Sequence, residues 1–74
     1  MKQKLDLCGQ NCPLPLLKTK KYLANIQHGD FVEVLTTDPS SINDIANFCA
    51  KTGNILVSQV TQNGITATVI RKKL

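Results

Sequence analysis

The residue best suited to chemistry is Cys12, which directly precedes the run Pro13-Leu14-Pro15. Proline is tolerated in the first turn of a helix, so this run predicts a helix that begins beside the cysteine. The unpaired N–H groups and the positive dipole end of that helix would stabilise a Cys12 thiolate over the thiol. An exposed thiolate on a small rigid body suits the attack on, or the presentation of, sulfane sulfur. The alternative is a cysteine that merely precedes a helix marked by prolines.

The other two cysteines have different surroundings. Cys8 lies four residues before Cys12 across a turn that contains glycine. At this spacing the two Cα atoms could come within the roughly 7 Å that a disulfide requires. Cys8 is either a small apolar side chain packed at a strand end or a resolving thiol that attacks a persulfide or sulfenate on Cys12. Cys49 falls on the apolar stripe of a predicted helix, so we expect it in the core.

A metal site is not expected from these residues. Structural zinc takes four matched ligands, whereas Cys8 and Cys12 form one C-x-x-x-C pair without a second pair at ligand spacing. His28 follows the first predicted helix, so we expect a solvent-facing side chain in a turn.

Three lysines follow Cys12 on the predicted helix: Lys18, Lys20 and Lys21. A positive surface beside a thiolate would steer an acidic partner towards it and would favour the anion. Lys20 projects near the apolar side of the helix, so we expect its aliphatic stem to lie along apolar surface. The alternative is an ordinary solvated helix face. The basic residues 71–73 are expected to form a soluble C-terminal tail.

Length and composition limit the class of protein. The chain has 74 residues, a net charge of +4 and 42% hydrophobic residues. Surface scaling predicts about 4,500 Å² of exposed surface after folding, which suits one domain over residues 1–74 without an enclosed substrate cavity. No apolar run approaches the roughly 20 residues that span a bilayer, and the N-terminal residues lack the apolar stretch of a secretory signal. We therefore expect a cytoplasmic protein without membrane contacts, whose three cysteines are reactive or buried thiols rather than a disulfide framework.

Hydrophobic periodicity and turn residues predict the order β-α-β-α-β-β. The expected elements are a strand around Leu5 and Leu7 that ends at Cys8-Gly9, a helix over 13–27, a strand over 31–37, a helix from Asp38-Pro39 to Gly53, and strands over 54–61 and 65–71 joined through Asn63-Gly64. Asp38 is placed to cap the second helix. Two helices cannot cover both faces of a four-stranded sheet. We therefore expect an α+β two-layer sandwich with a mixed sheet, both helices packed on one face and the other face open.

Side chains at intervals of three and four residues mark the inner faces of both helices. On the first helix they are Leu16, Thr19, Leu23 and Ile26, with Leu17 and Ala24 beside them. On the second helix they are Ile42, Ile45, Ala46 and Cys49.

The stretch LDLCGQNCPLPLL, residues 5–17, resembles the signature of the TusA/SirA-like sulfur-carrier family. That signature is Leu-Asp, two residues, Gly, two residues and then Cys-Pro-x-Pro, and it is matched here by Asp6, Gly9, Cys12, Pro13 and Pro15. The resemblance covers nearly the whole chain, since it continues through Gly29-Asp30, Asp38-Pro39-Ser40, Asp44-Ile45, Phe48-Cys49 and Gly53. Cys8 is a departure, because many members have arginine or an apolar residue there, although a subset has cysteine.

The resemblance implies a compact two-layer α/β sandwich that works as a carrier more than as a self-sufficient enzyme. Cys12 would accept sulfur as a transient persulfide from a cysteine desulfurase or a rhodanese-type donor and pass it to an acceptor protein, without a bound cofactor. Family members serve tRNA thiolation, molybdenum cofactor assembly, sulfur oxidation and, in some cases, selenium metabolism. Partners dock on the exposed side of the helix after the cysteine, where the three lysines lie. We expect a monomer that makes no direct contact with nucleic acid.

Two other functions fit part of the sequence. A mixed α/β fold with an open sheet face and a positive charge could bind RNA. The only aromatic residues are Tyr22, Phe31 and Phe48, however, and they provide no visible stacking platform. A thiol redox protein could use Cys8 and Cys12, although their spacing is one residue longer than the C-x-x-C of thioredoxin-like sites.

Overall fold

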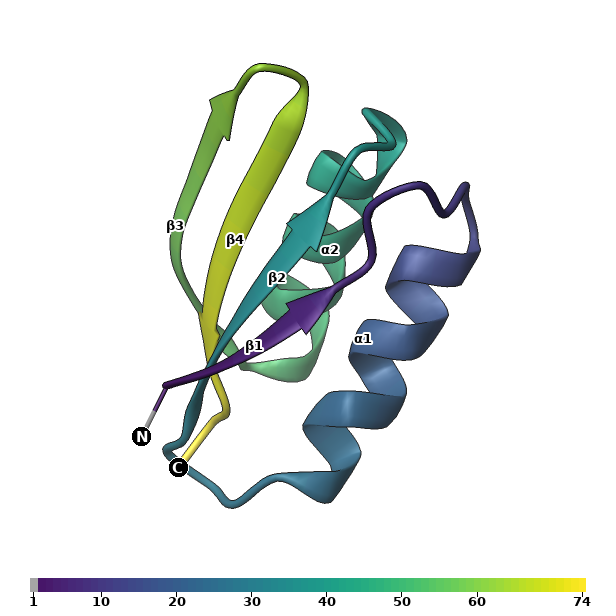
Figure 1. Ribbon diagram of the computed structural model, residues 1–74. Coiled ribbons are helices and arrows are strands. Elements are labelled where there is room, and N and C mark those ends of the chain that lie inside the picture. Colours follow the sequence, from purple (N-terminus) through teal and green to yellow (C-terminus); the bar gives the residue numbers. More distant parts are fainter. Residues whose placement is uncertain (1) are drawn as a thin grey trace.

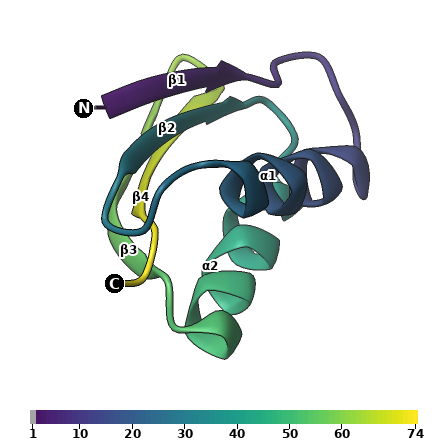
Figure 2. The same ribbon diagram turned by 90° about the horizontal axis from the view of Figure 1, so that it is seen from below.

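The computed structural model describes residues 2–74, in which two helices pack on one face of a four-stranded sheet. The elements are β1 (Lys2–Asp6), α1 (Leu14–Asn25), β2 (Phe31–Thr36), α2 (Ser40–Thr52), β3 (Ile55–Gln62) and β4 (Ile65–Arg71), as drawn in Figure 1. Figure 2 shows the sheet and the helices as two layers. The predicted element order and the α+β two-layer sandwich are confirmed, although β1 ends at Asp6, before the predicted Cys8-Gly9.

The sheet has the order β1-β2-β4-β3, with β1 parallel to β2 and the other two pairs antiparallel, so the expected mixed sheet is confirmed. The turn between β3 and β4 forms at Asn63 and Gly64, whose φ angles are 52° and 78°. Because β1 and β2 run parallel, their carboxyl ends lie at the same end of the sheet. The loops that follow them, which contain Cys12 and Asp38, therefore lie side by side (Figure 1).

The core lies between the sheet and the helices. Its buried apolar members are Leu7, Leu23, Val32, Val34, Ile45, Cys49 and Ile70. Burial of one aliphatic side chain of this size contributes about 1.5–3 kcal/mol. The exposed surface of 4476 Å² agrees with the value expected from chain length. The opposite face of the sheet has no helix on it, as predicted (Figure 2).

The inner face of α1 is narrower than the sequence predicted. Four of the predicted residues lie on it: Thr19 and Leu23 are buried, and Leu16 and Ile26 are half-buried. Leu17 and Ala24, expected beside them, are exposed instead. Successive residues of a helix are separated by about 100°, and at this spacing both side chains point away from the centre of the stripe. The buried arc extends in the other direction, towards Pro15.

The two ends of α2 differ in how well the sequence predicts them. Asp38 Oδ1 accepts the N–H of Ser40, the first helical residue, at 3.2 Å. The N-cap residue is Pro39, which has no side-chain cap bond, so the prediction that Asp38 occupies the cap position is wrong by one residue because the helix begins one residue later than expected. Gly53 has a φ of 83° and donates its N–H to the Cys49 carbonyl at 3.0 Å, which ends the helix as expected. Cys49 is buried, as predicted from its place on the apolar stripe.

The predicted C-terminal tail is wrong, because these residues are bonded to the fold. Arg71 ends β4, lies 5.3 Å from the centre of the Phe31 ring and donates Nε–H to the Gly29 carbonyl at 3.1 Å. Lys72 donates its N–H to the Asp30 carbonyl at 2.8 Å and its ammonium to a carbonyl at the end of α1. The chain after β4 therefore runs beside the turn that precedes β2.

Candidate functional site

Cys12 lies exposed on the loop between β1 and α1, and hydrogen bonds fix this loop to the residues that follow β2. The Cys12 N–H donates to Asp38 Oδ2 at 2.6 Å. The Gly9 N–H donates to Thr37 Oγ1 at 2.8 Å, and the positive φ of Gly9, 84°, gives the loop its turn. These bonds hold the backbone that presents the Cys12 thiol.

Asp38 joins this loop to the start of α2. Its carboxylate also accepts the Ser40 hydroxyl at 2.9 Å. The Ser40 hydroxyl, together with the N–H groups of Cys12 and Ser40, holds the pKa of Asp38 below its usual value. The sequence placed Asp38 at the start of α2, but did not predict that its carboxylate would bind the backbone of Cys12.

Asp44 supplies the polar partner of the Cys12 side chain. The Cys12 thiol donates to Asp44 Oδ2, with 3.6 Å between Sγ and the oxygen. Asp44 lies on α2, whereas only the amide groups of α1 were expected beside the sulfur. Two features of the sequence pointed towards Asp44. Parallel strands bring the start of α2 next to the Cys12 loop, and Asp44-Ile45 matches the family pattern.

Cys8 is exposed at the start of the same loop. Of the two alternatives for this residue, the packed apolar side chain is therefore wrong, and the resolving thiol stays a prediction. β1 ends early and Leu7 takes the core position, which leaves Cys8 outside. The Cys8 N–H donates to Asp6 Oδ1 at 3.0 Å. The Asp6 carboxylate raises the pKa of the Cys8 thiol, and the bond from the Cys8 N–H lowers the pKa of Asp6. Both loop cysteines are free thiols.

The two prolines of the motif have different positions. Pro13 is exposed next to Cys12, whereas Pro15 is buried on the inner side of α1. The Pro15 carbonyl accepts the Thr19 hydroxyl at 2.7 Å. Pro15 therefore anchors the first turn of α1 to the core, while Pro13 lies at the surface that presents the thiol.

The three lysines of α1 do not form one surface. Lys18 and Lys21 border a groove between α1 and β1. The Lys20 ammonium lies 5.6 Å from the centre of the Phe48 ring, on the side that faces α2. The sequence predicted that the aliphatic stem of Lys20 would lie along apolar surface; in the structure it is the ammonium that lies over an aromatic ring.

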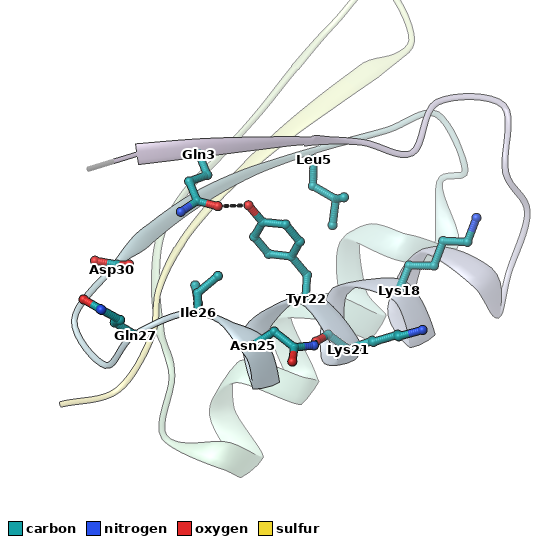
Figure 3. A pocket seen from close by; sticks show the side chains of 9 residues that line it. All are labelled: Gln3, Leu5, Lys18, Lys21, Tyr22, Asn25, Ile26, Gln27 and Asp30. Atoms are coloured by element: carbon teal, nitrogen blue, oxygen red, sulfur yellow. Dashed lines mark hydrogen bonds between the residues drawn. The ribbon is translucent and has the colours of Figure 1, made fainter.

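The groove between α1 and β1 has a volume of about 920 Å³ and is open to solvent. Figure 3 shows its lining residues: Gln3, Leu5, Lys18, Lys21, Tyr22, Asn25, Ile26, Gln27 and Asp30. The Tyr22 hydroxyl donates to Gln3 across it (Figure 3). None of the three cysteines lines this groove.

The remaining candidate residues lie away from the loop. Burial raises the pKa of the Cys49 thiol. His28 is exposed, as predicted, and its Nδ1 lies 2.9 Å from the Lys73 carbonyl. Within residues 2–74, no group of three or more His, Cys, Asp or Glu side chains could hold a metal ion. In the same part of the chain, neither helix has the length and apolar character needed to cross a bilayer.

Comparisons with known proteins point to one family. The family described as Sulfurtransferase TusA matches residues 3–72. The sulfur carrier protein TusA of Allochromatium vinosum is 40% identical over 70 residues, which cover 95% of this chain and 92% of that protein. The sulfur carrier protein TusA of Pseudomonas entomophila is 38% identical over 69 residues, or 93% of this chain and 86% of that protein. The crystal structure of a SirA-like protein from Desulfitobacterium hafniense has a TM-score of 0.85 and 26% identity, and the match covers 100% of both chains. The chain belongs to the TusA sulfurtransferase family.

Proposed function

We propose that this chain is a sulfur carrier that holds sulfane sulfur as a persulfide on Cys12 and passes it to an acceptor protein. Family membership supports the carrier role, because relatives that match over almost the whole chain are sulfur carrier proteins. The observation that carries the assignment to Cys12 is its exposed thiol on a loop fixed by hydrogen bonds to Thr37 and Asp38. A fixed, exposed sulfur can enter another protein's active site without a pocket of its own.

The transfer moves one sulfur atom without net oxidation or reduction. The Cys12 thiol loses its proton, and Sγ attacks the terminal sulfur of a persulfide on the donor's cysteine. An S–S bond forms on Cys12 while the donor's S–S bond breaks, and the donor's cysteine leaves as a thiolate that takes up a proton. In delivery, an acceptor thiolate attacks the terminal sulfur and Cys12 leaves as the thiolate. Cys12 therefore has to be both a nucleophile and a leaving group.

A carrier needs a donor protein and an acceptor protein that approach Cys12. We assign the donor to the cysteine desulfurase or rhodanese class, since both present sulfur on a cysteine. Leu14 and Leu17, near the start of α1, are 47% and 51% exposed and offer apolar contacts close to Cys12. Lys18 and Lys21, further along α1, could bind acidic groups at the edge of such a partner.

Radiolabelled sulfur tests the assignment. When a cysteine desulfurase is incubated with labelled cysteine and the chain, label should pass to the chain, remain through a non-reducing gel and leave when a thiol reductant is added. Cys12→Ser should stay unlabelled. Cys8→Ser, the matched control on the same loop, should be labelled like the wild type. Label on Cys12→Ser would show that another residue carries the sulfur.

The alternative of an RNA-binding module is weakened by the aromatic side chains, which are engaged within the fold. The Tyr22 hydroxyl is bonded to Gln3, and Phe48 packs against the core. Phe31 lies beside the Arg71 guanidinium. Each of the three rings has a different environment, so together they form no common platform on which bases could stack.

A further inference from the structure

We propose that Asp44 restrains Cys12 in the unloaded carrier, by accepting the hydrogen bond of its thiol and so favouring the thiol over the thiolate. The inference rests on the proposed role of Cys12 as the sulfur-carrying residue. It concerns the state of the protein between transfers, when the exposed sulfur would otherwise react with any small electrophile or oxidant.

The geometry places a negative charge against the sulfur. A thiol S–H is a weak donor and an ionised carboxylate is a strong acceptor, so the bond from Cys12 to Asp44 exists only while the thiol keeps its proton. Loss of that proton would leave two anions 3.6 Å apart, which is unfavourable. Asp38 adds a second carboxylate on the backbone side of Cys12.

The other loop cysteine also lies beside a carboxylate. Cys8 lies against Asp6, and that carboxylate raises the pKa of the Cys8 thiol. Asp44 has the further advantage of being half-buried on α2, so its position is fixed by the helix rather than by the loop.

Asp44 has no ion-pair partner among the described residues, so a partner protein could weaken its hydrogen bond with Cys12. Asp44 borders a shallow hollow between α1 and α2 together with Lys20 and Lys51, but neither lysine forms an ion pair with it within the described residues. A cationic group that a docking partner places on Asp44 would weaken its hold on the thiol. The restraint would thus be lifted where sulfur is to be transferred, and kept elsewhere.

The rate of alkylation by iodoacetamide, followed at Cys12 by peptide mass spectrometry across a range of pH, tests the proposal. Asp44→Asn keeps the shape of the side chain and removes its charge, and Asp44→Ala removes the acceptor without adding an amide. Both should increase the rate at pH 7 by about two- to fivefold, the size expected for an exposed charge interaction. Asp30→Asn removes the same charge beyond the far end of α1 and should leave the rate unchanged.

The shape of the pH profile separates restraint from loosened structure. Restraint predicts that the variants and the wild type converge at high pH, where every Cys12 is a thiolate. A variant that merely loosens the loop would react faster at high pH as well, and that result would overturn the proposal, as would equal rates at every pH. Alkylation does not require sulfur uptake, so failure of this proposal leaves the carrier assignment standing, and failure of persulfide loading would be detected separately.

Discussion

At the residue scale, the two exposed cysteines are held by carboxylates in different ways. Cys8 lies beside the carboxylate of Asp6, the last residue of β1. The raised pKa of Cys8 keeps it mainly as the thiol at neutral pH. Cys12 is bound to Asp38 and Asp44, which come from the loop after β2 and from α2. A resolving role for Cys8 stays a prediction.

Asp38 makes the free energy of unfolding depend on pH in the acidic range. Its folded-state pKa lies below the ordinary value of 3.8, so its contribution to the free energy of unfolding is fully present above that pH and is lost as pH falls through the lowered pKa. Asp38→Asn should therefore lose less stability than the wild type over this acidic range. Urea unfolding at several pH values measures the difference. Asp30→Asn, whose carboxylate accepts no bond from the Cys12 loop, should retain the wild-type slope, and a parallel change in both variants would contradict the assignment.

At the element scale, the site depends on the two loops that follow the parallel strands β1 and β2. Their side-by-side position follows from strand direction, and the sequence predicts it once the element order is known. Cys12 is identifiable because its chemistry is indicated by adjacent residues. Asp44 matches the family pattern, but nothing adjacent to it indicates a contact with the sulfur, because it lies 32 positions further along the chain and reaches Cys12 only through the packing of α2. No local pattern says which polar residue of α2 faces the loop.

The end of α2 has a simple test. A Cβ at Gly53 would meet only Lys73 Cδ at 3.8 Å, an ordinary contact, so the cost of a substitution comes from the positive φ of 83°. Gly53→Ala should lower the free energy of unfolding by about 1 kcal/mol. Gly53→Asn should lose less, since asparagine adopts this conformation more readily. Denaturant titration measures both values, and equal losses would mean that the backbone conformation is not the cause.

At the scale of the whole molecule, a small core leaves little stability in reserve. A chain of this length is expected to unfold at a cost of about 4–11 kcal/mol. The prediction for residues 71–73 is wrong because the Lys72 N–H binds the Asp30 carbonyl, which is distant in the sequence. Such a tertiary contact cannot be predicted from a run of basic residues. In a protein this small, even the last residues of β4 contribute to holding the layers together.

Ile45 tests this limit. It is fully buried on α2, so Ile45→Ala should lower the free energy of unfolding by about 2–5 kcal/mol, a large part of the total. Val60→Ala, at a side chain that is 58% exposed on β3, should change it by no more than about 0.5 kcal/mol. Thermal and urea unfolding of the two variants give the comparison. Similar losses for both would show that the core has been placed wrongly.

The intact mass of the protein after sulfur loading tests the carrier assignment most directly. Incubation with a rhodanese and thiosulfate should add one sulfur atom, about 32 Da, which a thiol reductant removes. Cys8→Ser and Cys49→Ser should gain the same mass, whereas Cys12→Ser should gain none. A reductant-sensitive gain of one sulfur by Cys12→Ser, or no gain by the wild type under conditions that load another carrier, would contradict the account.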